Sequence, residues 1–201
     1  MKKICVLLAA IVCCGCSSAS NSISSNDETV TTIENTILDE YVDAAVQEYN
    51  LATMEELIDS PIYDDVVKND CVLLYPKVDD SKYTLYDIEA NELGGWYAFY
   101  FIENETGKSI IYDISYGTKI SDIEEFSSNH GANKTIMATA ESGGNTYEVC
   151  LTTTTFDQQE NYVINFIPED NYFISLRAGN ASTTDEILQY FPEFELVAYA
   201  E

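Results

Sequence analysis

The 201-residue sequence contains few of the residue types on which many classes of protein depend. It has one histidine and only nine basic residues, against 35 acidic ones. The shortage of basic residues excludes nucleic-acid binding, because a chain of net charge −26 repels a phosphate backbone. Anionic lipid headgroups are repelled in the same way, so a purely electrostatic attachment to a membrane is excluded as well.

The sequence also lacks the patterns that carry common enzyme chemistry. Its only histidine, His130, comes directly after an expected helix, and we interpret it as a structural residue of the following loop. A zinc site needs more Cys or His ligands than the chain offers. Neither a Gly-x-Ser-x-Gly motif nor a phosphate-cradling loop is present. Carboxylates are so numerous that no particular pair stands out as a glycosidase site. We therefore predict no catalytic residue, no metal site and no cofactor.

Cysteine is scarce beyond the N-terminal segment. Four of the six cysteines lie at positions 5–16, which leaves only Cys71 and Cys150. In the strands expected around them, Cys71 shares a face with apolar Leu73, whereas Cys150 shares a face with charged Glu148. Because these environments differ, the pattern favours two free thiols over a disulfide bridge between them.

The N-terminus carries the most specific pattern of the chain. Lys2 and Lys3 precede an apolar run over residues 4–12, and Gly15 and Cys16 follow it. The run is too short to cross a bilayer as a helix, so export and cleavage is the better interpretation. The layout resembles the signal of bacterial membrane-anchored lipoproteins, in which the chain is cut before a cysteine whose thiol then carries a diacylglyceryl group.

This resemblance implies a signal peptide over residues 1–15 and lipidation at Cys16, with further acylation by a fatty acid such as palmitate. The third position before the lipidated cysteine is usually Leu, Val or Ile, and here it is Cys13. The alternative is an ordinary secretory signal that is cut near Ser18 or Ala19. In the lipoprotein interpretation, two acyl chains hold the protein stably at the cell membrane, facing outside the cytoplasm.

The rest of the chain is predicted to be a stalk followed by one domain. Residues 16–31 are small and polar without periodicity, which is typical of a flexible stalk. Residues 32–201 are long enough for a single domain. It opens with an amphipathic helix predicted over 32–49, which we expect to dock on a sheet. The apolar positions at helical spacing are Ile33, Ile37, Tyr41, Ala44, Ala45 and Tyr49.

From Asp70 onward the apolar period changes to two, which is the period of a strand. Short turns that join successive strands require antiparallel neighbours. The predicted fold class is α+β: an antiparallel β-sheet meander of about eight strands, with the N-terminal helix and two short helices packed on one face. The strands are predicted at residues 71–76, 83–89, 95–103, 108–116, 134–141, 145–155, 161–167 and 172–178, with Phe194–Ala200 as one further strand.

Capping patterns place the short helices. One helix is predicted to begin at Ser121 and another at Ser182, each where a hydroxyl residue precedes acidic residues. A further short helix is predicted from Thr53 to Asp59, ending at the Ser60-Pro61 pair because the residue before a proline disfavours helical geometry.

One predicted strand, 95–103, is apolar on both faces, so it is expected to be central and covered on both sides. Its rings are either core residues or the lining of a cleft that holds an apolar or peptide-like ligand. Acidic residues around such a cleft would favour a cationic ligand over an anionic one. The candidate cleft residues are Trp96, Tyr97, Phe99, Tyr100 and Phe101.

The C-terminal part carries a second resemblance. Strand Tyr162–Phe166, a turn, strand Tyr172–Leu176 and the segment Gly179–Leu188 are similar to the end of a large family of uncharacterised extracytoplasmic domains. Members occur in bacterial lipoproteins and in membrane proteins associated with sigma-factor regulation. The resemblance covers about residues 90–191 and brings no catalytic residues with it. It implies a sensing or binding role.

The sequence thus predicts a non-enzymatic binding or sensing module anchored to the membrane through Cys16. The expected ligand or protein partner is apolar, peptide-like or cationic. A structural or assembly partner of a cell-envelope complex is one alternative, and it would require an exposed apolar patch. A hydrolase that works through two carboxylates is the other, and it would require paired acids at the floor of a cleft.

Overall fold

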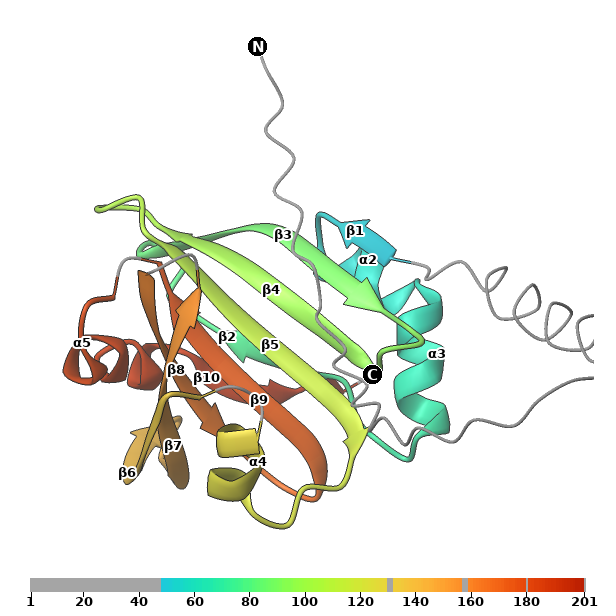
Figure 1. Ribbon diagram of the computed structural model, residues 1–201. Helices are drawn as coiled ribbons and strands as arrows, with labels where there is room; N and C mark the ends of the chain where they lie inside the picture. The colour runs from blue at the N-terminus through green and yellow to red at the C-terminus, as the bar shows by residue number, and fades with distance from the viewer. Residues whose placement is uncertain (1–47, 130–131, 157–158, 180, 201) are drawn as a thin grey trace, which may run out of the picture. The chain divides into compact units, whose positions relative to one another are not determined.

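Eight strands form one antiparallel sheet in the part of the chain that the computed structural model describes (Figure 1). The described residues are 48–129, 132–156, 159–179 and 181–200. The predicted signal peptide, the Cys16 anchor, the stalk, most of the 32–49 helix and His130 lie outside them. The strands of this sheet are β1 (Glu48–Leu51), β3 (Tyr83–Asn91), β4 (Trp96–Glu103), β5 (Ser109–Thr118), β6 (Lys134–Ser142), β7 (Asn145–Phe156), β8 (Gln159–Phe166) and β9 (Asn171–Ala178).

The strand order is β1-β3-β4-β5-β9-β8-β7-β6, so the sheet consists of two runs of hairpins that meet where β5 pairs with β9. The predicted α+β class and its large antiparallel sheet are confirmed. The predicted meander is wrong at two points. The first predicted strand, 71–76, corresponds to β2 (Leu74–Lys77) in a separate two-stranded sheet, and β1 pairs with β3 in its place. The second break lies between β5 and β6, because β6 lies at the far edge of the sheet and not beside β5. The segment between them carries helix α4 (Ile123–Asn129) across one face of the sheet before β6 begins.

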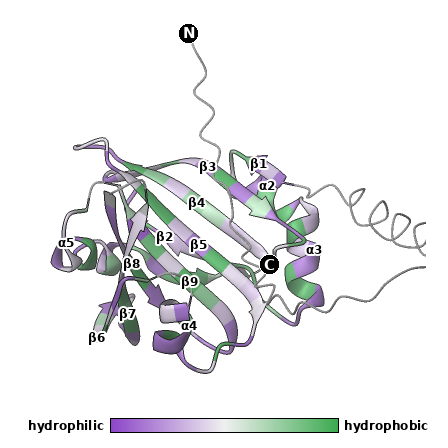
Figure 2. Cartoon of the chain, in the orientation of Figure 1, coloured by the Kyte–Doolittle hydropathy of each residue, from purple (hydrophilic) through white to green (hydrophobic). Residues whose placement is uncertain are grey.

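The hydrophobic core lies on one face of the sheet, to which alternate side chains of the strands point. Figure 2 shows the matching change between apolar and polar residues along the strands. Helices α2 (Met54–Ile58) and α3 (Pro61–Lys68) contribute buried residues to this core, as do α5 (Thr184–Leu188) and the short 3₁₀ helix η1 (Phe191–Glu193). A two-stranded sheet of β2 (Leu74–Lys77) and β10 (Glu195–Ala198) lies on the same side.

Three tyrosines of the sheet fasten the α3–β2 segment by their hydroxyl groups. The Tyr97 hydroxyl donates to the Leu74 carbonyl at 2.9 Å and accepts from the Leu74 amide at 3.0 Å. Tyr172 makes the same pair of bonds with Val72, and Tyr116 donates to an Asp65 carboxylate oxygen of α3. Burial raises the pKa of all three phenols, so they remain protonated donors.

Helix α4 lies on the other face of the sheet, in front of β8 and β9 in Figure 1. Its Ser127 accepts a hydrogen bond from Asn165, which points away from the core because its neighbours Ile164 and Phe166 point into it. The prediction that the short helices pack on one face is therefore wrong for α4. The side chain of Asp122 caps this helix, so it begins one residue later than the Ser121 capping pattern indicated.

Each predicted strand corresponds to an observed strand, and Phe194–Ala200 contains β10. The largest shift is that of the 71–76 strand, since β2 begins at Leu74. The predicted 53–59 helix is confirmed as α2, whereas one local prediction is wrong and the helix α3 was not predicted. Glu48 and Tyr49 belong to β1 and not to the end of the 32–49 helix. The Ser60-Pro61 pair ends α2 but also begins α3, because proline fits the first helical turn and the Ser60 hydroxyl accepts from the Ile62 amide at 3.3 Å. Cys71 and Cys150 are both buried free thiols, as predicted.

The start of α5 is held by a reciprocal cap and an ion pair. Thr183 accepts from the Glu186 amide, while the Glu186 carboxylate accepts from the amide and hydroxyl of Ser182. The same carboxylate lies 2.7 Å from the amino group of Lys108, the residue directly before β5. The hydrogen bonds from Lys108 and Ser182 lower the pKa of Glu186 to about 2, which keeps the carboxylate charged.

Candidate functional site

The five rings of the predicted cleft lie on two opposite faces of β4. Tyr97, Phe99 and Phe101 point into the core and are almost completely buried. The Phe101 ring centroid lies 5.4 Å from that of Phe194, and the Tyr97 centroid lies 5.8 Å from that of Phe99. These three rings pack against other side chains and line none of the described hollows. They are core residues in the described structure.

Trp96 and Tyr100 point to the opposite face, where each is half-buried. Within the described ranges this side of β4 is covered only in part, since Ala98 is fully buried whereas Ile102 at the end of the strand is 38% exposed. We call the surface that β3, β4, β5 and β9 present on this side the open face. Its principal side chains are Tyr86, Glu89, Trp96, Tyr100, Ile102, Asp113 and Arg177.

An ion pair lies on the β5–β9 side of the open face. Arg177 on β9 donates from Nη2 to Oδ2 of Asp113 on the neighbouring strand β5. The two side chains are 38% and 24% exposed, so water reaches the pair only in part. Burial raises the pKa of Asp113, and the Arg177 charge opposes that shift. The Arg177 Nε atom is buried and has no hydrogen-bond partner among the described residues.

Tyrosine rings extend the open face towards β3. The Tyr100 hydroxyl donates to Glu89 at 2.5 Å, and the Tyr100 ring meets the Tyr86 ring edge-on at a centroid distance of 6.0 Å. Tyr100 lies opposite Ile111, which in turn lies opposite Arg177, so one cross-strand row joins the aromatic part to the ion pair. Burial and the bond to Glu89 raise the pKa of Tyr100, which therefore stays a neutral donor.

A polar layer attaches α4 to the sheet beside the open face. The Asn165 amide donates to Ser127 of α4 and to Thr152 of β7, and its oxygen accepts from Ser175 of β9 at 2.7 Å. Cys150 is buried beside this layer, and burial raises the pKa of its thiol. A thiol in this state has little thiolate character, so the position does not suit a nucleophile.

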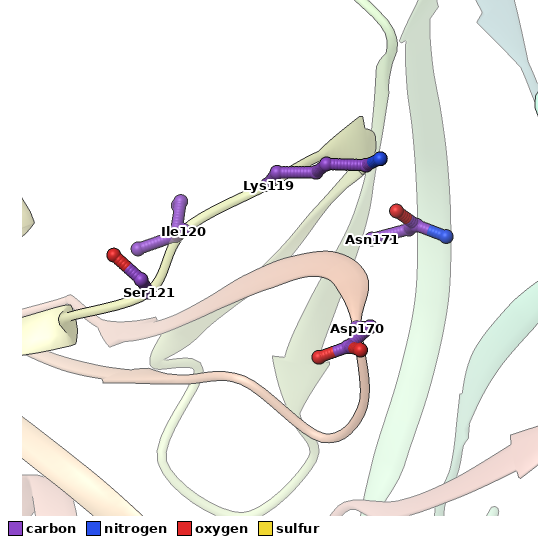
Figure 3. A pocket seen from close by; sticks show the side chains of 5 residues that line it. All are labelled: Lys119, Ile120, Ser121, Asp170 and Asn171. Atoms are coloured by element: carbon purple, nitrogen blue, oxygen red, sulfur yellow. The ribbon is translucent and has the colours of Figure 1, made fainter.

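Hollows open to solvent at three places: at the loop before α4, at α4 itself, and between β7, the β8–β9 turn and the small β2–β10 sheet. One has a volume of about 580 Å³ and lies between the β5–α4 loop and the β8–β9 turn (Figure 3). Lys119 extends along its loop towards the side on which Asn171 lies, and Asp170 is the only carboxylate in the lining. A single carboxylate without a partner does not make the acid–base pair that the hydrolase alternative requires.

The other two hollows have volumes of about 400 and 350 Å³. The smaller one has an apolar floor of Ile123, Met137 and Ile167, and its rim carries carboxylates. The rim carboxylates are Asp122, Glu124 and Glu148. All three are exposed, whereas a general acid needs burial that raises its pKa. We define this hollow and its three carboxylates as the acidic hollow.

Metal binding and membrane crossing can be considered for the described residues. They contain no group of three or more His, Cys, Asp or Glu side chains placed to hold a metal ion. None of their helices combines the length and the apolar character that crossing a membrane requires.

Comparisons with known proteins give no relative for this chain: no protein-family model matches it, and neither the curated proteins nor the solved structures include a significant match.

Proposed function

We propose that this chain is a non-enzymatic binding module, anchored outside the cytoplasm through Cys16, and that the open face contacts a protein partner. One observation carries this proposal. Trp96 is the only tryptophan of the chain and Arg177 the only arginine, and both lie on the open face. Tyr86 and Tyr100 lie beside them. Trp, Tyr and Arg are the residue types that dominate the binding energy of protein interfaces.

The composition of the open face supports a folded protein or a peptide as the partner. Its aromatic rings offer apolar area with polar tips, which suits the centre of an interface. Ile102 and Tyr86 are 38% and 47% exposed and add apolar area at the edge of the same surface. This exposed area also fits the assembly-partner alternative, since both interpretations require a protein on this face. No described group favours the hydrolase alternative.

The proposed anchor gives a direct prediction. Replacing Cys16 by serine should release the protein from the membrane fraction, because serine cannot form the thioether to a diacylglyceryl group. Membrane flotation and immunoblotting measure the distribution, and intact-mass analysis of the wild-type protein should show an acylated N-terminus at Cys16. An unmodified N-terminus downstream of Cys16 would contradict the anchor and leave the binding proposal to its own test.

The open face is tested by site-specific photo-cross-linking in intact cells. A photoreactive phenylalanine analogue at position 86 or 102 replaces Tyr86 or Ile102, two exposed apolar side chains, with little effect on packing. We expect both positions to give the same cross-linked protein species, and the additional change Trp96→Ala to weaken it. Val67 on α3, 53% exposed, provides the matched control position. Cross-links from Val67 but none from the open face would refute the proposal.

A further inference from the structure

The edge strand β6 has an unusually regular form for the rim of a sheet. It is nine residues long and pairs with β7 from Lys134 opposite Thr153 to Ser142 opposite Asn145 without a bulge. On its other side no described strand is paired with it, because it ends the strand order of the sheet. The opposite edge strand, β1, is only four residues long.

The hairpin turn shows which residues of β6 present free backbone groups. Gly143 and Gly144 have φ angles of +57° and +78°, as a two-residue turn between Ser142 and Asn145 requires. In such a turn the two flanking residues bond to each other, and alternate residues of the strand then bond to the partner strand. The N–H and C=O groups of Thr135, Met137, Thr139 and Glu141 therefore point outward from the sheet.

The 3₁₀ helix η1 approaches β6 from the core side, where Phe191 packs against Tyr147 and Phe166, and no backbone hydrogen bond joins it to the outward groups of β6 in the described residues. The other usual protections of an edge strand do not interrupt this row either. Edge strands normally avoid pairing with other chains by means of proline, bulges, shortness or charged side chains. β6 contains no proline or glycine, and its two charged residues, Lys134 and Glu141, stand near its ends. The residues between them are Thr, Ile, Met, Ala, Thr and Ala. The middle of the edge is thus available to a further strand.

The acidic hollow lies beside this edge, on the α4 side of the sheet. Met137 of β6 forms part of its apolar floor, and Glu148 of β7 lies opposite Thr139 of β6. Glu124 of α4 approaches the Thr135 hydroxyl, at 3.5 Å. A side chain on an added strand, opposite Met137 or Thr139, would point to this same face and lie next to the hollow.

We propose that β6 receives an extended segment of a partner protein as a ninth strand of the sheet, and that a lysine or arginine of that segment enters the acidic hollow. Backbone hydrogen bonds to the outward N–H and C=O groups of β6 hold the partner segment. Every second side chain of that segment faces the acidic hollow, which selects a basic residue there. The apolar floor accommodates the methylene stem of a long basic side chain, while the rim carboxylates bind its charged end.

Charge favours a basic segment over a second copy of this chain. Two copies joined at β6 would bring together two acidic rims on chains that each carry a net charge of −26. This binding mode goes beyond the proposed function and uses a different surface, since the open face is formed by β3, β4, β5 and β9.

The test measures the binding of a labelled seven-residue peptide, in which lysine and valine alternate, to the purified protein by fluorescence anisotropy. We expect saturable binding, and binding at least about tenfold weaker for the same peptide with glutamate in place of lysine. Thr139→Pro should weaken binding at least about fivefold, because it removes one outward N–H at an edge position where proline is tolerated. A peptide N-methylated at alternate residues should fail to bind, and it tests strand pairing without any change in the protein.

The variant pair Glu124→Gln and Glu148→Gln tests the hollow separately from the edge. The double variant should bind the lysine peptide and the glutamate peptide with more similar affinities. The loss of affinity on N-methylation of the peptide should stay the same, because the backbone bonds to β6 are unchanged. Two glutamines placed far from β6, at the exposed residues Glu105 in the β4–β5 turn and Glu55 on α2, give a control with the same change in net charge. Binding that survives N-methylation would show non-specific attraction and overturn the proposal. So would a dimer that sedimentation detects in wild type and not in Thr139→Pro, since a second copy would then occupy the edge.

Discussion

Replacing Phe194 by alanine is expected to lower the free energy of unfolding by about 3–5 kcal/mol, the range for removing a fully buried aromatic ring. The Phe194 side chain is 1% exposed. Its ring centroid lies 5.0 Å from Tyr83, 5.4 Å from Phe101 and 6.0 Å from Tyr112. The substitution therefore opens a cavity where strands β3, β4 and β5 meet the segment that leads into β10. Denaturant unfolding followed by Trp96 fluorescence measures the change.

Ile102→Ala is the matched control, because this side chain is also apolar but 38% exposed. Its effect should stay near 0.5 kcal/mol, as for most surface substitutions. A domain of this size has a total stability of about 5–15 kcal/mol, so Phe194→Ala can unfold a large fraction of the molecules. In that event Phe194→Leu gives a smaller effect that can still be measured. A loss below about 1 kcal/mol for Phe194→Ala would contradict the described core.

Replacing Arg177 by methionine should destabilise the protein by about 1–3 kcal/mol at neutral pH, because it leaves the Asp113 carboxylate without its partner. The loss is smaller than for a fully buried pair, since both side chains keep some contact with water. Methionine retains much of the volume of the arginine stem, so the effect reports mainly on charge. Chemical denaturation at several pH values measures it.

The pH dependence of this loss distinguishes charge from packing. Burial raises the folded-state pKa of Asp113 above its ordinary value of 3.8, while Arg177 opposes the shift. The folded protein therefore holds this proton more tightly than the unfolded chain. The associated stability is complete below pH 3.8 and is lost as the pH rises through the folded-state pKa.

Without Arg177 the Asp113 pKa rises further, so the deficit of the Arg177→Met variant should be smaller at pH 4 than at pH 7. The double variant Arg177→Met, Asp113→Asn should lose this pH dependence, because it has no carboxylate at position 113. An equal deficit at both pH values would show that the ion pair contributes only through packing.

Local patterns predicted most of the individual elements. The period-two pattern that predicted a strand over 108–116 corresponds to β5, in which Ile110, Tyr112 and Ile114 are buried. Strand pairing was harder to predict, because each hairpin turn fixes only its own two strands. The pairing of β5 with β9 depends on tertiary packing between segments some sixty residues apart in sequence, such as Ile110 and Ala178.

The candidate site depends on the pairing of strands that are distant in sequence, which the sequence did not predict. The contact between Asp113 and Arg177 follows from the β5–β9 pairing and so could not be predicted. Trp96 and Tyr100 were grouped with Tyr97, Phe99 and Phe101 because all five occur in one apolar run. A run that is apolar on both faces does not show which face is covered by the rest of the chain. The edge position of β6 also follows from the β5–β9 pairing, so it could not be predicted either.

The pairing of β5 with β9 has a consequence for the order in which the molecule can be completed. Until β9 has been made, β5 has an unpaired edge in the middle of the future sheet, and Tyr112 and Ile114 lack their cross-strand neighbours Leu176 and Ile174. Contacts between such distant segments carry a high loop-closure cost and favour slow, cooperative folding. A nascent chain that ends before Asn171 would therefore expose the unpaired edge of β5, which could pair with other chains. The two hairpin runs are accordingly interdependent halves of one folding unit, and neither is a module that could be exchanged between proteins.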